Sequence, residues 1–179
     1  MEPNVTTTPT VTPRSSGIRY GVIGGLISIV YFLVLTTAGV DMSQGIGRWA
    51  GMLITIAIIY LAHKYYKDNG DGFMSYAQGI GIGFWIGVVS AVISSIFTYI
   101  YAKFIDPSFI TTIREKAIAD MEAQGQPQSQ IDAAMPWVER FTSAEMIFLL
   151  GLFFGVLITV VVALIITIFT QKPQPEQSI

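Results

Sequence analysis

Four long apolar segments constrain the fold of this chain more than any other feature. Each is close to the roughly 20 residues that an α-helix needs to cross about 30 Å of hydrocarbon. We place these spans at residues 18–40, 43–62, 76–101 and 144–170. A water-soluble bundle of four buried helices is the alternative, but its helices would carry a charged outer stripe. Because residues 149–169 contain no charge, we expect an all-α integral membrane protein with four transmembrane helices.

Short polar stretches connect the first three spans. A tight turn is predicted at residues 39–44, and turn dipeptides lie within residues 63–75. Short connections of this kind make successive helices antiparallel neighbours.

Both ends of the chain are polar, and we predict disorder there. Residues 1–16 are rich in Thr and Pro, and residues 172–179 form a Pro-rich tail. This leaves a membrane domain at residues 17–171. The first span is longer than the apolar core of a usual signal peptide, but cleavage after Thr36-Thr37-Ala38 stays open.

Composition argues against several classes of function. The net charge is −2 and no basic tract is present, so nucleic-acid binding has no electrostatic support. Cysteine is absent, which removes disulfides and thiolate chemistry. His63 is the only histidine, and its place beside Lys64 at a predicted helix end favours a solvated, interfacial position. We therefore expect no catalytic, cofactor-binding or metal-binding residues, and no enzyme.

The long connection at residues 102–143 has a helical pattern of its own. Asp106-Pro107 is typical of a helix start. Apolar residues then recur every four positions, at Phe109, Ile113, Ala117 and Met121. A second short helix is predicted at about residues 129–141, with a kink at Pro136. We expect an amphipathic helical hairpin between the third and fourth spans, which either covers the end of the bundle or carries the specific function.

Small residues recur every four positions on three of the spans. Such spacing lets helix backbones approach closely. The contact could lie within one bundle, at a dimer seam, or along a narrow path on the glycine face. The helix-packing candidates are Gly21, Gly25, Gly79, Gly83, Gly87, Gly151 and Gly155.

Polar residues within the spans are few. Arg48 and Glu145 lie at the starts of the second and fourth spans, at the same membrane face, so an interfacial ion pair between them is possible. With Asp106 they would form the only plausible core of an enzyme. A channel or transporter would instead need a polar stripe at mid-membrane, for which the chain offers Thr55, Ser90, Ser94, Thr98 and Thr159.

Three sequence runs resemble a known family. They are DGFMSYAQG at residues 71–79, FIDPSF at 104–109 and QIDAAM at 130–135. With the glycine-rich spans, they are similar to the domain of unknown function 4199 family, small four-span membrane proteins mainly of Bacteroidetes-type bacteria. The resemblance implies a bacterial inner membrane and assigns no activity.

We expect the termini to be cytoplasmic and residues 102–143 to be periplasmic, because the rule for positive charges gives most weight to short loops and helix ends. The first hypothesis for function is a non-enzymatic accessory or interaction protein. Its partners would be the lipid bilayer and either a second copy or another membrane protein. A small oligomeric channel or transporter is the alternative.

Overall fold

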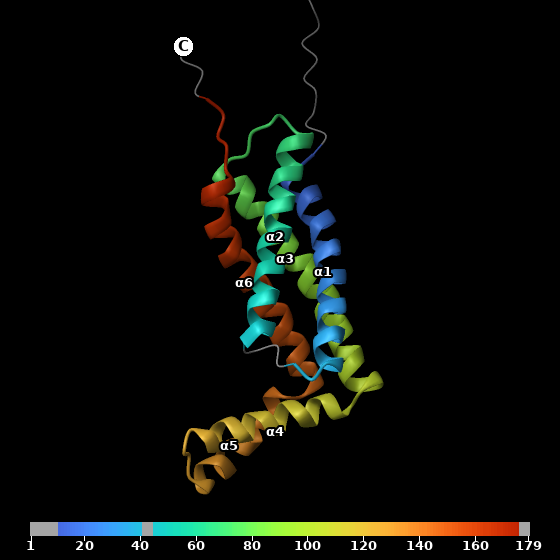
Figure 1. The fold of residues 1–179 in the computed structure, drawn as a ribbon, viewed down its shortest axis with the longest axis vertical. Helices are drawn as coiled ribbons and strands as arrows, with labels where there is room; N and C mark the ends of the chain where they lie inside the picture. Colours follow the sequence, from blue (N-terminus) through green and yellow to red (C-terminus); the bar gives the residue numbers. More distant parts are fainter. Residues whose placement is uncertain (1–10, 41–44, 176–179) are drawn as a thin grey trace, which may run out of the picture.

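The computed structural model describes residues 11–40 and 45–175, and this part of the chain is helical (Figure 1). Four of its helices are long and apolar enough to span a membrane, with α3 continuing into the π-helix η1. They lie side by side in a bundle, and two shorter helices lie across one end of it (Figure 1). The elements are α1 (Pro13–Thr37), α2 (Gly45–Asn69), α3 (Tyr76–Ile100), η1 (Tyr101–Ile105), α4 (Ser108–Ala123), α5 (Gln128–Phe141) and α6 (Ala144–Thr170).

The first helix begins earlier than the sequence suggested. Thr12 and Ser15 form a capping box, and Pro13 occupies the first helical position. The prediction of disorder over residues 1–16 is therefore wrong for residues 13–16, while residues 1–10 lie outside the described part. Thr12, Pro13 and Ser15 are signals of a helix start that the Thr- and Pro-rich composition of residues 1–16 does not reveal.

The C-terminal segment is also tied to the bundle. Met74 and Lys172 form an antiparallel bridge in which each backbone N–H donates to the other carbonyl at 2.8 Å. The side-chain amide of Gln174 donates to Asp71 at 2.7 Å. Disorder from residue 172 onwards is thus wrong for residues 172–174, and residues 176–179 lie outside the described part. Of the turn predicted at residues 39–44, residues 41–44 also lie outside it.

Helix α3 is the central element, because it packs most extensively against both α1 and α6. On the α6 side, a Cβ atom added at Gly83 would overlap the Cβ of Ala163, and one at Gly155 would lie 3.0 Å from the Cβ of Ala91. On the α1 side, a Cβ at Gly21 would lie 2.7 Å from the Cβ of Val89. The structure places all seven small-residue candidates at contacts of this kind within the chain: Gly21 and Gly25 against α3, Gly79, Gly83 and Gly87 against α6, and Gly151 and Gly155 against α3.

Helix α2 packs unevenly along its length. Its C-terminal half buries Ile58, Ile59, Ala62, His63 and Tyr66, whereas Gly47 is the only residue buried before Ile58. The N-terminal half of α2 is therefore packed more loosely against α1, α3 and α6 than its C-terminal half is.

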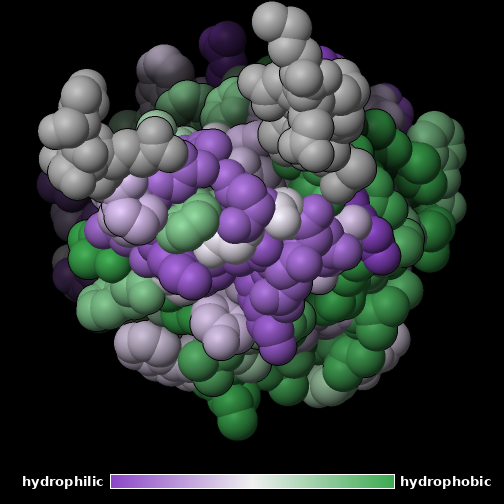
Figure 2. Space-filling view, turned by 90° about the horizontal axis from the view of Figure 1, so that it is seen from above, coloured by the Kyte–Doolittle hydropathy of each residue, from purple (hydrophilic) through white to green (hydrophobic). Residues whose placement is uncertain are grey.

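Large apolar side chains cover the outside of the bundle. Phe169 is 80 % exposed and Phe153 is 62 % exposed. Viewed from the end where α1 begins and α6 ends, hydrophilic residues gather over the end of the bundle and hydrophobic residues surround it (Figure 2). Apolar flanks with polar ends fit a bilayer as the surrounding solvent.

The connection between α3 and α6 forms two helices, α4 and α5, at the end opposite the start of α1 and the end of α6 (Figure 1). The carboxylate of Asp106 accepts a hydrogen bond from the backbone N–H of Ser108 at 3.1 Å. Helix α4 begins at Ser108 with Pro107 as its N-cap, one residue later than the predicted start, and no side chain caps it. Gly125, with φ of +72°, lies in the turn between α4 and α5. An aromatic cluster attaches α4 to the bundle, since the ring of Phe109 lies 5.4 Å from Phe32 and 5.7 Å from Tyr101.

The contact between α3 and α6 can be tested with two glycines of one helix. We expect Gly83→Ala to lower the free energy of unfolding by about 1–3 kcal/mol, because the added methyl group overlaps Ala163. Gly81→Ala is the control, since its Cβ would meet nothing closer than the Cβ of Pro13, at 3.8 Å. Denaturant titration in bicelles measures both variants, and equal effects would contradict the close contact.

Candidate functional site

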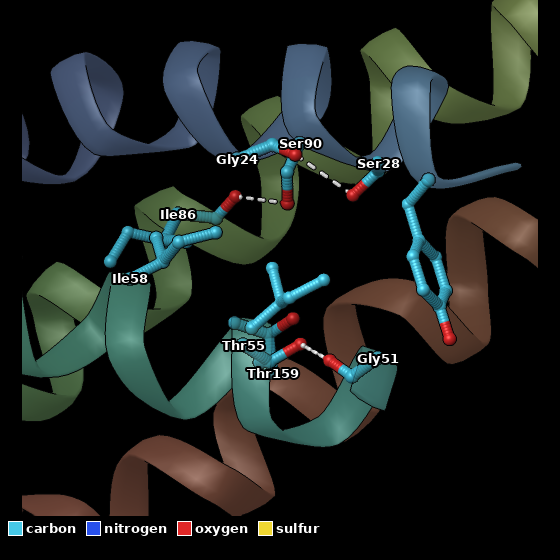
Figure 3. Close-up of a pocket in the computed structure, with 10 residues that line it drawn as sticks. Gly24, Ser28, Gly51, Thr55, Ile58, Ile86, Ser90 and Thr159 are labelled. Carbon is cyan, nitrogen blue, oxygen red and sulfur yellow. Dashed lines mark hydrogen bonds between the residues drawn. The ribbon is translucent and has the colours of Figure 1, made fainter. Parts of the chain in front are cut away.

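A small, partly open cavity lies between α1, α2, α3 and α6, where Gly24 and Ile86 are buried and Ser28 is half-buried. Its volume is about 70 Å³. Labelled side chains from all four helices surround it (Figure 3). Its lining consists of Gly24, Ser28, Tyr31, Gly51, Ile54, Thr55, Ile58, Ile86, Ser90 and Thr159.

The hydroxyl groups of the cavity share one hydrogen-bonding pattern. Ser28 donates to the carbonyl of Gly24 at 2.8 Å, and Ser90 donates to that of Ile86 at 2.7 Å (Figure 3). Thr55 donates to the carbonyl of Gly51 at 3.0 Å. Thr159 likewise donates to Gly155 at 2.8 Å. Each hydroxyl hydrogen is thus used by the helix that carries it, so the oxygen lone pairs remain available as acceptors.

The cavity has no charged wall. Among residues 11–40 and 45–175, no Asp, Glu, Lys, Arg or His lines it. At one end the hydroxyl of Tyr31 donates to the carbonyl of Gly47, and the Tyr31 ring lies over Gly51. A tyrosine therefore links α1 to the loosely packed half of α2 beside the cavity.

The structure brings together three of the five hydroxyl residues singled out from the sequence. Thr55, Ser90 and Thr159 line the cavity, whereas Ser94 and Thr98 do not. Sequence reasoning missed Ser28 and Tyr31. The signal for Ser28 was its position four residues after Gly24, on the glycine-rich face of the first span.

His63 was expected at the solvated interface, and this prediction is wrong. Its side chain is completely buried. Its Nε2 lies 3.0 Å from the carbonyl oxygen of Gly79, and its Nδ1 lies 2.8 Å from Oγ1 of Thr170. The reason is that α2 continues to Asn69 rather than ending near residue 62, so His63 faces α3 and α6 from inside a helix.

The neighbouring Lys67 strengthens the same junction. Its Nζ donates to the backbone carbonyl of Thr170 at 2.8 Å, at the C-terminal end of α6. A cation is favourable there because the last carbonyl groups of a helix lack partners within the helix. His63 and Lys67 together join α2 to the end of α6.

The ion pair considered possible between Arg48 and Glu145 is not formed, because Glu145 pairs with another residue. Glu145 bonds to Lys103 at 2.9 Å, and Lys103 also donates to the hydroxyl of Tyr99 at 2.8 Å. Lys103 follows α3, and α3 packs directly on α6, so this lysine lies beside Glu145. Asp106, the third residue of the enzyme alternative, accepts a hydrogen bond from the backbone N–H of Ser108 instead.

No three His, Asp or Glu side chains within residues 11–40 and 45–175 gather as metal ligands.

A family model for proteins of unknown function (DUF4199) matches residues 19–172. The chain belongs to this family. None of the curated proteins and none of the solved structures shows significant similarity to this chain. The match covers α1 from residue 19 onwards, all of α2, α3 and α6, and the connection that contains α4 and α5, so it includes every residue of the cavity.

Replacing His63 tests the junction of α2, α3 and α6. We expect His63→Leu to lower the free energy of unfolding by about 1–3 kcal/mol, because both hydrogen bonds of a fully buried ring are lost. The exposed neighbour gives the control, and Lys64→Gln should change stability by less than about 0.5 kcal/mol. A His63→Leu variant as stable as the control would contradict the role of this junction.

Proposed function

We propose that this chain is a non-enzymatic interaction protein of the bacterial inner membrane, and that its α4–α5 hairpin holds a partner on the periplasmic side. The observation that carries the proposal is the exposure of the hairpin. No residue of α4 is buried, and Ile131 is the only buried residue of α5. Two helices of this size are ordered beside the bundle without adding to its core.

The glycine rows support the hairpin as the interacting surface. The glycine faces of the helices are the other surface that a partner could bind. However, Gly21, Gly83 and Gly155 are already packed against neighbouring helices of the same chain. A dimer seam built on these rows would have to displace those contacts. A partner that binds the hairpin would not have to displace contacts of this kind.

One edge of the hairpin is suited to the bilayer surface. Trp137 and Phe141 stack with ring centroids 6.3 Å apart, and they are 61 % and 48 % exposed. Phe104 and Ile105, at the end of the third span, are also exposed. Aromatic residues of this kind favour the interface between headgroups and acyl chains. Glu115 and Glu122 are exposed on α4, and they are the residues that we expect to contact the partner.

Charge distribution supports the orientation. The end of the bundle that carries the termini holds Arg14, Arg19, Lys64, Lys67 and Lys172, close to helix ends or in short segments. The opposite end also holds five basic residues, but Arg114 and Lys116 among them belong to the long connection, and the rule that places basic residues on the cytoplasmic side gives most weight to short loops and helix ends. The hairpin, at the opposite end, is then periplasmic.

A small oligomeric channel or transporter is the second candidate, and the cavity favours it. Thr55, Ser90 and Thr159 are polar residues at mid-membrane that a purely structural bundle does not require. Four spans enclose little space, so a wide path would need several copies of the chain.

The proposed orientation can be tested with single thiols, because the native chain has no cysteine. We expect Ser129→Cys to react with a membrane-impermeant maleimide in intact cells whose outer membrane has been permeabilised. Asp68→Cys, exposed at the opposite end, should react only after lysis. The reverse pattern would place the hairpin in the cytoplasm.

The interaction itself can be tested by photo-crosslinking in cells. We expect a photoreactive residue at Glu122 to give a discrete adduct with an envelope protein or a second copy, and Glu115→Lys to weaken that adduct. The same group at Phe169, an exposed position on the apolar flank, is the control and should react only with lipid. Adducts from Phe169 with none from Glu122 would contradict the hairpin as the interacting surface.

A further inference from the structure

We propose that the cavity between α1, α2, α3 and α6 is a binding site for small uncharged molecules that donate hydrogen bonds, and that water occupies it. The proposal does not rest on the interaction role of the hairpin. It holds whether or not the chain conducts a solute.

The size and polarity of the cavity meet the requirements for buried water. Its volume of about 70 Å³ is several times the roughly 10–15 Å³ that one water molecule needs. Buried water also needs two to four polar partners. Ser28, Thr55, Ser90 and Thr159 supply oxygen atoms from four different helices.

The hydrogen bonds within the lining favour bound molecules that donate hydrogen bonds. All four hydroxyl groups already donate to carbonyl groups of their own helices. What they offer to the cavity is therefore lone pairs, which accept hydrogen bonds. A molecule that only accepts hydrogen bonds finds no partner there, whereas water, ammonia or a small alcohol does.

The absence of charged lining residues selects against ions. Burying an ion costs several kcal/mol unless an opposite charge or a complete set of ligands replaces its hydration. Within the described part of the chain, no carboxylate lines the cavity to balance a cation, and no Lys, Arg or His lines it to balance an anion. The bound molecule is therefore uncharged.

The position of the cavity supplies an entry route. It lies beside the N-terminal half of α2, where Gly47 is the only residue buried before Ile58. The hydroxyl of Tyr31 fastens this half of α2 to α1 through the carbonyl of Gly47. Tyr31→Phe keeps the ring and removes this bond, so it should ease exchange of the bound molecule with bulk water.

Water-edited solid-state NMR of the full chain in bilayers tests the proposal, with water itself as the probe. Thr159 and Thr167 form a matched pair, because both lie on α6 and both donate to the carbonyl four residues earlier. Thr159 lines the cavity, whereas Thr167 is completely buried against Gly79. We expect magnetisation to pass from water to Thr159 several-fold faster than to Thr167, although Thr167 is closer to the end of its helix.

Two results would overturn the proposal. Equal transfer to Thr159 and Thr167, whether fast or slow, would mean that the cavity holds no water of its own. A saturable shift of the Thr159 signal on titration with Na⁺ or K⁺ would show a cation site instead. Ser90→Ala gives an independent check, because removing one acceptor should slow the transfer to Thr159 if water bridges the two side chains.

Discussion

The close contact of α3 with α1 and α6 is the interaction on which the rest of the structure depends. Lipid tails are as apolar as leucine side chains, so helices in a bilayer gain little from hiding apolar surface from each other. They gain instead from dispersion forces at short range, and these need small residues at the contact. Gly21 and Gly83 provide such positions on α1 and α3, where an added Cβ would meet a neighbouring side chain.

This packing explains the position of α2 and the cavity between α2 and the other three helices. α1, α3 and α6 form a tight layer, and α2 lies against it with larger side chains at its C-terminal half. There His63 and Lys67 fix the helix to α3 and α6. The N-terminal half of α2 lacks such residues, so space remains between it and the layer. The hydroxyl groups that border this space distinguish it from an apolar packing defect, which would stay empty.

The sequence predicted those features that depend on local composition. The fourth span, at residues 144–170, was predicted at its observed bounds because charge is absent from most of it, and in the structure Ser143 caps it. The start of α3 at Tyr76 was also predicted, and it follows a capping box between Ser75 and Gln78. Features that depend on which helices become neighbours were not predicted. Glu145 bonds to Lys103 instead of Arg48, because α6 packs on α3 more extensively than on α2. His63 is buried because two other helices cover it, and no pattern within α2 reveals that. The cavity was not predicted because its hydroxyl groups come from four helices, and only the packing of these helices brings the groups together.

A pair of engineered cysteines tests most directly whether the glycine contacts lie within one chain. A Cβ at Gly151 would lie 3.8 Å from the Cβ of Ser95, which is about the mean Cβ separation of a disulfide, near 3.8 Å. In the native background without cysteine, Ser95→Cys combined with Gly151→Cys should form a disulfide within the monomer under mild oxidation. Non-reducing electrophoresis should then show a monomer that migrates faster, and mixed single-cysteine chains should stay uncrosslinked. A covalent dimer from the mixed single variants would contradict the account, because it would place the glycine face between two copies of the chain.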